Sequence, residues 1–311
     1  MSLSVILQQM GVICILVAIG VLLQKRAVVD ALTSKKLSAI VVDVCNPAMI
    51  MASILGGDIT AGHRDLIYAA VIGAVFYAFL MIIGLVMPHI LRVKRSDRKF
   101  YNLMSVYTNT GFLGIPVARA ILPPNAIIYV IVINVFYSLL FYTHGLTVLG
   151  KGEGGNRGKS SVLKILNPGT IMALLSLVVF WFHLDLPPIL GNTIQYVGNA
   201  TVFLSMVLLG VSISRSGLGD ALKDIRIWAF ILLRMVLVPL IIVLIMHSIS
   251  FDKTAILAMC LMAAVPVGNL PMIQAEKQGM DTSILSSAIA VTTAVSIFTI
   301  TALITAVSVV L

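Results

Sequence analysis

Long apolar stretches, separated by short polar segments, make up almost the whole chain. A helix that crosses a bilayer needs about 20 mostly apolar residues, and ten stretches approach or exceed that length. They cover residues 4–24, 37–55, 66–88, 100–122, 125–149, 167–184, 189–213, 226–248, 254–275 and 282–310. The pattern predicts an all-α polytopic membrane protein with ten transmembrane helices and no separate soluble domain.

The composition agrees with this pattern. Hydrophobic residues make up 59% of the 311 positions and charged residues only 11%, whereas a soluble domain carries roughly 25% charged residues. Cys14, Cys45 and Cys260 lie inside apolar stretches, without metal-ligand spacing, and read as small core residues. No basic segment precedes the first stretch, so we expect it to be a retained helix and not a signal peptide.

The basic residues alternate between the loops. Loops 1–2, 3–4, 5–6 and 7–8 together hold sixteen Lys and Arg residues, and the other loops hold Arg64, Lys253 and Lys277. Cytoplasmic loops are the ones enriched in Lys and Arg. We therefore expect a cell-membrane (inner or plasma membrane) protein with both termini outside. The net charge of +9 then reflects topology and contact with anionic lipid, not nucleic-acid binding.

Five spans on each side of the chain's midpoint predict two inverted repeats. We expect a first five-helix repeat over 1–150, a cytoplasmic linker over 151–166 and a second repeat over 167–311. Five is an odd number, so the second repeat is upside down relative to the first. Inverted repeats are typical of secondary transporters, which bind substrate near the bilayer midplane at discontinuous helices.

Spans 4 and 9 carry matching helix breakers. Residues 107–116 read YTNTGFLGIP and residues 265–271 read VPVGNLP, and Pro and Gly both weaken a helix. Half-helices that begin near Pro116 and Pro271 would direct positive N-terminal dipoles at a polar cavity, which suits an anion. Ordinary proline kinks are the alternative interpretation. The candidate substrate-binding residues are Asn109, Thr110, Gly111, Gly114, Pro116, Gly268, Asn269 and Pro271.

Each polar candidate has a structural alternative. Asn109 either donates to a substrate carboxylate or caps the broken backbone, and Asn269 is proposed from its matching position alone. Arg119 either attracts the anion or extends to the membrane interface. Arg234 in span 8 is either a substrate or coupling group, or a clamp on charges and carbonyls. Asp43 either couples protons, pairs with a basic group, or closes a kink before a proline.

The two breaker segments also carry a family resemblance. The motifs are Asn109-Thr110-x-x-x-Gly114-Ile115-Pro116 and Pro266-x-Gly268-x-x-Pro271-x-x-x-Ala275. They resemble the fourth-helix and ninth-helix motifs of the auxin efflux carrier family. The chain lacks the long cytoplasmic loop of the plant members and is similar to the short bacterial ones, which include malate and malonate permeases.

The resemblance implies a fold shared with bile-acid symporters and an elevator mechanism. Spans 1, 2, 6 and 7 would form a scaffold, often dimeric, and spans 3–5 and 8–10 a mobile transport domain. Bile-acid symporters place a carboxylate at the crossover to help bind sodium. Segments 107–116 and 265–271 contain none, so coupling to protons or to the membrane potential is expected instead.

These observations favour a secondary transporter of a small organic anion, such as a carboxylate. The segment GEGGNRGKS at 152–160 lacks the spacing of a phosphate-binding loop, and no His/Cys or paired-acid set indicates an enzyme. No cofactor is expected. The alternative from a different class is a membrane ligand sensor or regulated channel with the same fold.

The alternation of basic loops generates a topological prediction. A cysteine added at the N-terminus and a cysteine at Ser96 should react with a membrane-impermeant reagent from opposite sides of the membrane. Labelling of both from the same side would contradict the ten-span plan.

Overall fold

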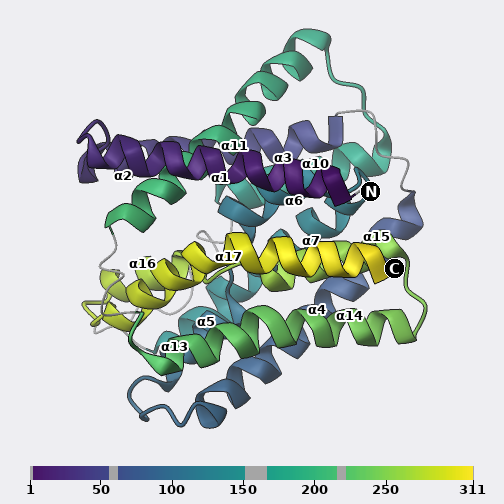
Figure 1. The fold of residues 1–311 in the computed structure, drawn as a ribbon. Coiled ribbons are helices and arrows are strands. Elements are labelled where there is room, and N and C mark those ends of the chain that lie inside the picture. Colours follow the sequence, from purple (N-terminus) through teal and green to yellow (C-terminus); the bar gives the residue numbers. More distant parts are fainter. Residues whose placement is uncertain (1–2, 56–61, 151–166, 216–221, 311) are drawn as a thin grey trace.

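The computed structural model describes residues 3–55, 62–150, 167–215 and 222–310, which are almost entirely helical (Figure 1). The first half of the chain forms α1 (Leu3–Lys25), α2 (Ala31–Ile40), α3 (Asn46–Leu55), α4 (His63–Ile90), α5 (Arg98–Val106), α6 (Ile115–Ile121), α7 (Ala126–Leu140) and α8 (Leu146–Leu149). The second half forms α10 (Pro168–Phe182), α11 (Pro188–Arg215), α13 (Ile225–Phe230), α14 (Val238–Ser248), α15 (Lys253–Ala264), α16 (Leu270–Lys277) and α17 (Ser283–Val310).

Four π-helical turns widen these helices. They are η1 (Val41–Cys45), η2 (Thr110–Gly114), η3 (Phe141–Gly145) and η4 (Ile231–Leu237). Three of them join flanking α-helices into continuous stretches, and η2 precedes α6. Single π-helical turns inside α-helices are often found at functional sites, and here they interrupt otherwise apolar segments.

Six continuous helical stretches in the described residues are long and apolar enough to cross a membrane. Shorter apolar helices lie over Gly11–Lys25, Thr110–Ile121, Pro168–Phe182 and Lys253–Ala264. The outer surface carries large apolar side chains, with Leu85, Leu244 and Phe298 each more than 60% exposed. The six stretches are Ala31–Leu55, His63–Ile90, Ala126–Leu149, Pro188–Arg215, Ile225–Ser248 and Ser283–Val310. A polytopic membrane protein without strands in the described part therefore agrees with the sequence prediction.

The largest boundary difference is at the second stretch, which begins at Ala31 and not at residue 37. The carboxylate of Asp30 accepts a hydrogen bond from the Thr33 backbone N–H at 2.7 Å and so caps the helix. Hydrogen bonds with Thr33 lower the pKa of Asp30. The helix therefore begins in the polar segment 31–36, before the apolar pattern starts at residue 37. The predicted linker 151–166 lies outside the described residues.

The helices pack as two groups. In the first, α11 contacts α1 and α3, and α3 contacts α10. In the second, α4 contacts α5 and α7, while α15 contacts α7, α14 and α17. Figure 1 places the first group in the upper part of the molecule, and α4, α5, α13 and α14 in the lower part. The first turn of α1 and the last turn of α17 lie at the same end of the bundle.

Two glycines allow α1 and α11 to touch along their backbones. A Cβ on Gly20 would fall on the carbonyl oxygen of Val207, and one on Gly210 would fall on that of Val17. Small residues are what permits such an approach between helices in a bilayer, where apolar burial does not drive association. The close packing of α1 on α11 therefore depends on glycine at positions 20 and 210.

We expect Gly20→Ala to lower the melting temperature of the purified protein, because the added methyl group meets backbone. Overpacking of this kind costs about 1–3 kcal/mol. Gly11→Ala is the matched control, since it lies in the same helix with nothing within 4 Å of its Cβ position. Equal melting temperatures for the two variants would contradict the close packing of α1 on α11.

Candidate functional site

The helices of spans 4 and 9 are both interrupted. Helix α5 ends at Val106 and the chain becomes helical again at Thr110, while α15 ends at Ala264 and α16 begins at Leu270. The sequence predicts a half-helix that starts near Pro116, but the structure starts it at Thr110, with η2. Pro116 lies in the first turn of α6, directly after the π-helical turn η2 and inside the continuous stretch Thr110–Ile121.

The two interruptions bind each other. The Asn109 N–H donates to the Pro266 carbonyl at 2.8 Å, and the Gly268 N–H donates to the Tyr107 carbonyl at 3.0 Å. These bonds form an antiparallel bridge centred on Thr108 and Val267. Unpaired backbone groups in an apolar interior cost several kcal/mol each, so each broken segment supplies what the other lacks.

Glycine at position 268 allows the two segments to approach closely. A Cβ there would lie 3.0 Å from the carbonyl oxygens of Tyr107 and Thr108, so the bridged backbone would have to shift by a few tenths of an ångström. Pro266 fits because its carbonyl is the group that the bridge uses. The breakers therefore both end the helix and permit the bridge between the two interruptions.

Arg234 hydrogen-bonds to one backbone carbonyl in each broken span at this crossing. Its Nε donates to the Ser105 carbonyl and its Nη1 to the Ala263 carbonyl, both at 2.6 Å. In an unbroken helix these carbonyls would accept from Asn109 and Val267. Those two N–H groups instead donate to Pro266 and to the Thr292 hydroxyl.

The guanidinium is thus placed at the C-terminal, negative ends of both half-helices. Arg234 is 1% exposed, and its Nη2 has no partner among the described residues. Of the two roles that the sequence leaves open, the structure places the side chain as a carbonyl clamp.

Asn109 caps the second half of span 4. Its Oδ1 accepts from the Phe112 backbone N–H at 3.2 Å, which is the N-cap arrangement. Its Nδ2 makes no hydrogen bond to a described residue, so the amide hydrogens remain for a ligand. Both interpretations of Asn109 from the sequence are therefore compatible with its position, because capping uses only the oxygen.

Two further amides lie beside this cap. The Thr110 hydroxyl donates to Asn134 Oδ1 at 3.2 Å. A Cβ on Gly111 would lie 3.3 Å from Asn134 Oδ1 and 3.5 Å from Asn46 Nδ2. Asn46 Oδ1 is buried without a partner in the described part of the chain. We call Asn46, Asn109, Thr110 and Asn134 the amide cluster.

The sequence analysis missed two members of this cluster. Asn134 is the single amide in the apolar helix α7, and Asn46 precedes Pro47 at the start of α3. An isolated amide inside an apolar span is a signal that could have found them, because a buried polar group needs a partner. The partner itself is not readable from sequence.

The other candidates lie apart from the amide cluster. Asn269 is exposed and lines a cavity of about 290 Å³ together with Ser34, Arg215 and Ser286. This cavity lies between α2 and α11 on one side and α16 and α17 on the other. Asn269 therefore faces a different space from Asn109, although their sequence positions match.

Two ionisable candidates also remain outside the cluster. Arg119 is half-buried near the end of α6, and its Nη1 is buried without a partner among the described residues. Asp43 is exposed in η1, between the exposed side chains of Val42 and Val44. Neither makes a contact that ties it to the interruptions.

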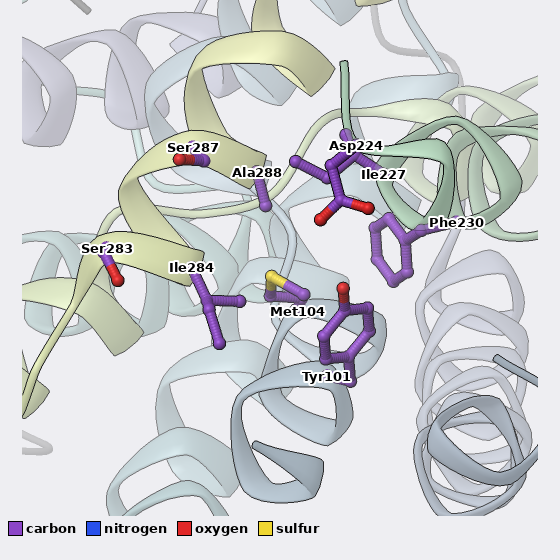
Figure 2. A pocket seen from close by; sticks show the side chains of 9 residues that line it. All are labelled: Tyr101, Met104, Asp224, Ile227, Phe230, Ser283, Ile284, Ser287 and Ala288. Atoms are coloured by element: carbon purple, nitrogen blue, oxygen red, sulfur yellow. The ribbon is translucent and has the colours of Figure 1, made fainter. Parts of the chain in front are cut away.

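A second polar pocket lies between α5, α13 and the first turns of α17 (Figure 2). Its volume is about 220 Å³, and its lining includes Tyr101, Asp224, Ser283 and Ser287. The carboxylate of Asp224 accepts from the Arg226 backbone N–H at 2.9 Å and caps α13. Among the described residues no group of three or more His, Cys, Asp or Glu side chains could hold a metal ion.

Apolar helices with paired interruptions and a buried amide cluster define a polytopic membrane transport protein. The model of the membrane transport protein family matches residues 5–304. The chain belongs to this family, and the resemblance to auxin efflux carriers is confirmed.

Two curated relatives cover nearly the whole chain. An uncharacterized transporter of Methanothermobacter thermautotrophicus is 24% identical over 287 residues, which are 92% of this chain and 93% of the relative. An uncharacterized transporter of Methanocaldococcus jannaschii is 24% identical over 300 residues, 93% of this chain and 94% of the relative. Similarity along the full length supports one transporter fold and not a shared segment.

We expect Arg234→Met to lower the melting temperature strongly, because two buried carbonyls lose their donor. A hydrogen bond to a charged group contributes about 1.5–3 kcal/mol. Arg234→Lys should give an intermediate loss, since one ammonium lacks the planar fork that reaches both carbonyls. Arg119→Met is the control, and a drop as large as that of Arg234→Met would contradict the clamp.

Proposed function

We propose that the protein is a secondary active transporter of a small organic anion, with the substrate bound at the paired interruptions. The observation that carries this proposal is the amide cluster, which lies at the N-terminus of a half-helix inside an apolar interior. The Asn46 Oδ1 is buried without a partner among the described residues, which is costly unless a ligand or water meets it. A transport site must be polar when occupied and enclosed by protein.

The charge of the substrate follows from the local electrostatics. The helical stretch Thr110–Ile121 carries at its start the partial positive charge of a helix N-terminus, which favours an anion. The N–H groups of Thr110 and Phe112 already donate to Thr108 and Asn109, so this charge acts on a ligand through the helix dipole. The absence of a side chain at Gly111 exposes backbone next to Asn46 and Asn134. Amide N–H groups donate to a carboxylate, so small carboxylates such as malate or malonate are the first ligands to test.

The proposed topology has ten spans in two inverted repeats, 1–150 and 167–311. The six long stretches and four shorter apolar helices occur in the predicted order. The shorter ones at positions 4 and 9 are the interrupted ones. The first turn of α1 and the last turn of α17 lie at one end of the bundle, and the described basic connections, from α1 to α2 and from α4 to α5, lie at the other. With the basic loops in the cytoplasm, both termini would be outside the cell.

The two helix groups suggest an elevator mechanism. The group of α1, α2, α3, α10 and α11 corresponds to spans 1, 2, 6 and 7 and would be the scaffold, which would also carry a homodimer contact. The second group contains both interruptions and would move as one body, because the bridge and Arg234 tie spans 4, 8 and 9 together. Asn46 belongs to the scaffold, so the amide cluster would lie where the two bodies meet.

The function is tested in proteoliposomes loaded with purified protein. Radiolabelled malonate or malate should accumulate against its concentration gradient when a pH gradient or a membrane potential is imposed. A ligand sensor would bind the carboxylate without accumulating it, and a channel would not accumulate it under a pH gradient with the membrane potential held at zero. Either result would contradict secondary active transport.

Asn109 allows binding and capping to be separated. We expect Asn109→Ala to weaken malonate binding by roughly tenfold to a hundredfold, the value of one charge-assisted hydrogen bond of about 1.5–3 kcal/mol. It should also lower stability, because the N-cap is lost.

Asn109→Asp is the matched control for this experiment. Its carboxylate can still cap the helix, but it repels an anion. We therefore expect near-wild-type melting temperature with malonate binding lost in this variant. Wild-type affinity in a folded Asn109→Asp protein would remove Asn109 from the site.

A further inference from the structure

His144 is an ionisable side chain that reaches the interruption of span 4 from span 5. It is half-buried in η3, and its Nδ1 lies 2.9 Å from the phenol oxygen of Tyr107. Tyr107 is the C-cap residue that follows the end of α5 at Val106. The histidine is therefore hydrogen-bonded to the crossing of the two broken helices, although 37 positions separate it from Tyr107.

The hydrogen-bond pattern selects one tautomer. The Tyr107 hydroxyl donates to the Leu140 carbonyl at 2.9 Å, and its single hydrogen cannot also serve His144. The contact is satisfied when His144 carries a hydrogen on Nδ1 and donates it to the phenol oxygen. In that tautomer Nε2 is the basic atom. A proton added at Nε2 keeps the bond to Tyr107 and strengthens it, because the donor becomes charged.

Tyr107 connects this proton site to the backbone bridge. Its carbonyl accepts the Gly268 N–H at 3.0 Å. Its ring packs edge-on against Tyr137 and Phe141, with centroid distances of 5.7 and 5.1 Å. Because Tyr137 and Phe141 pack against the Tyr107 ring, the ring cannot move without the backbone of Tyr107. A change in the hydrogen bond between His144 and the phenol therefore affects the backbone bridge.

In the described part of the chain, the elements that pack on the turn of His144 are uncharged. Helices α7 and α8, which contact η3, contain no charged residue. The described titratable side chains around His144 are phenols: Tyr107 in contact, Tyr137 behind that ring, and Tyr142 in the same π-helical turn. An imidazolium would therefore be an uncompensated charge here, unless an anion binds nearby.

The charged side chains on α5 and at its C-terminal end do not contact His144 in the described structure. Arg98 and Lys99 lie in its first turn, and Arg234 is bonded to the Ser105 carbonyl. His144 lies five residues before the end of α8, or about 8 Å along a helix, so it is close to the end of that helical stretch.

We propose that His144 binds the coupling proton of transport on Nε2, and that Tyr107 transmits its binding to the crossing; this rests on the proposed function. An anion moved alone through the membrane carries an unbalanced charge through a low dielectric. A proton bound at the same crossing offsets that charge. Histidine suits the task because its ordinary pKa of about 6.5 lets it bind and release protons near neutral pH.

The test measures protons and substrate together in proteoliposomes. The vesicles contain a pH-sensitive dye, and uptake of radiolabelled malonate is followed in parallel. In the wild type, internal acidification should accompany malonate in a fixed ratio of one proton to one malonate. In His144→Gln, whose amide can donate to Tyr107 but cannot titrate, the ratio of protons to whatever malonate still moves should fall to near zero. His247→Gln, at an exposed histidine near the end of α14, should keep the wild-type ratio.

Tyr107→Phe keeps the packed ring and removes the acceptor of the Nδ1 hydrogen. The imidazolium then loses a charge-assisted bond, so the pH of half-maximal uptake should shift downward. A wild-type ratio in His144→Gln, an unshifted midpoint in Tyr107→Phe, or wild-type uptake without protons would overturn the proton site while leaving anion transport in place. No uptake of malonate or malate by the wild type would instead contradict the proposed function itself.

Discussion

A broken helix inside a membrane must find partners for the backbone groups that the break releases, and no water is there to supply them. In this protein the two broken segments serve one another. Tyr107 and Asn109 form backbone hydrogen bonds with Gly268 and Pro266. Arg234 donates to the carbonyls of Ser105 and Ala263, one in each broken span. Helices from spans 4, 8 and 9 are thereby joined at one point. In the proposed elevator mechanism, a body held together in this way would move without exposing its broken backbone to lipid.

The π-helical turns hold several of the polar and ionisable residues of the membrane-spanning helices. Each of the four π-helical turns holds a polar or ionisable residue that an apolar span would not otherwise contain: Asp43 in η1, Thr110 in η2, His144 in η3 and Arg234 in η4. A π-helical turn carries an extra residue and shifts the faces of the helix on either side. Polar side chains of spans 4, 5 and 8 are brought toward one crossing, while Asp43 is left on the exposed surface.

The sequence predicts much of this arrangement because its local signals are strong. Matching Gly and Pro clusters in the two halves of the chain specify where the helices break. The depth of Arg234 within span 8 already indicates a clamp as one of its two roles. The Asp30 cap and the start of the half-helix at Thr110 are local too, but a short side-chain hydrogen bond decides them and hydropathy does not.

Long-range partners are what the sequence does not reveal. Asn46, Asn134 and His144 become informative only once packing places them against Gly111, Thr110 and Tyr107. Matching positions in the two halves of the chain also mislead at Asn269, which faces the cavity beside Arg215 and not the amide cluster. Segments at matching positions pack against different neighbours.

The central claim is that the crossing of the two broken helices is the anion site. A cryo-electron microscopy structure of the full chain with malonate tests it most directly. The account predicts spans 4 and 9 broken at Tyr107–Asn109 and Val265–Asn269, with ligand density within hydrogen-bond distance of the Asn109 side-chain amide. A continuous helix through either segment, or malonate bound only in the pocket beside Asp224, would contradict it.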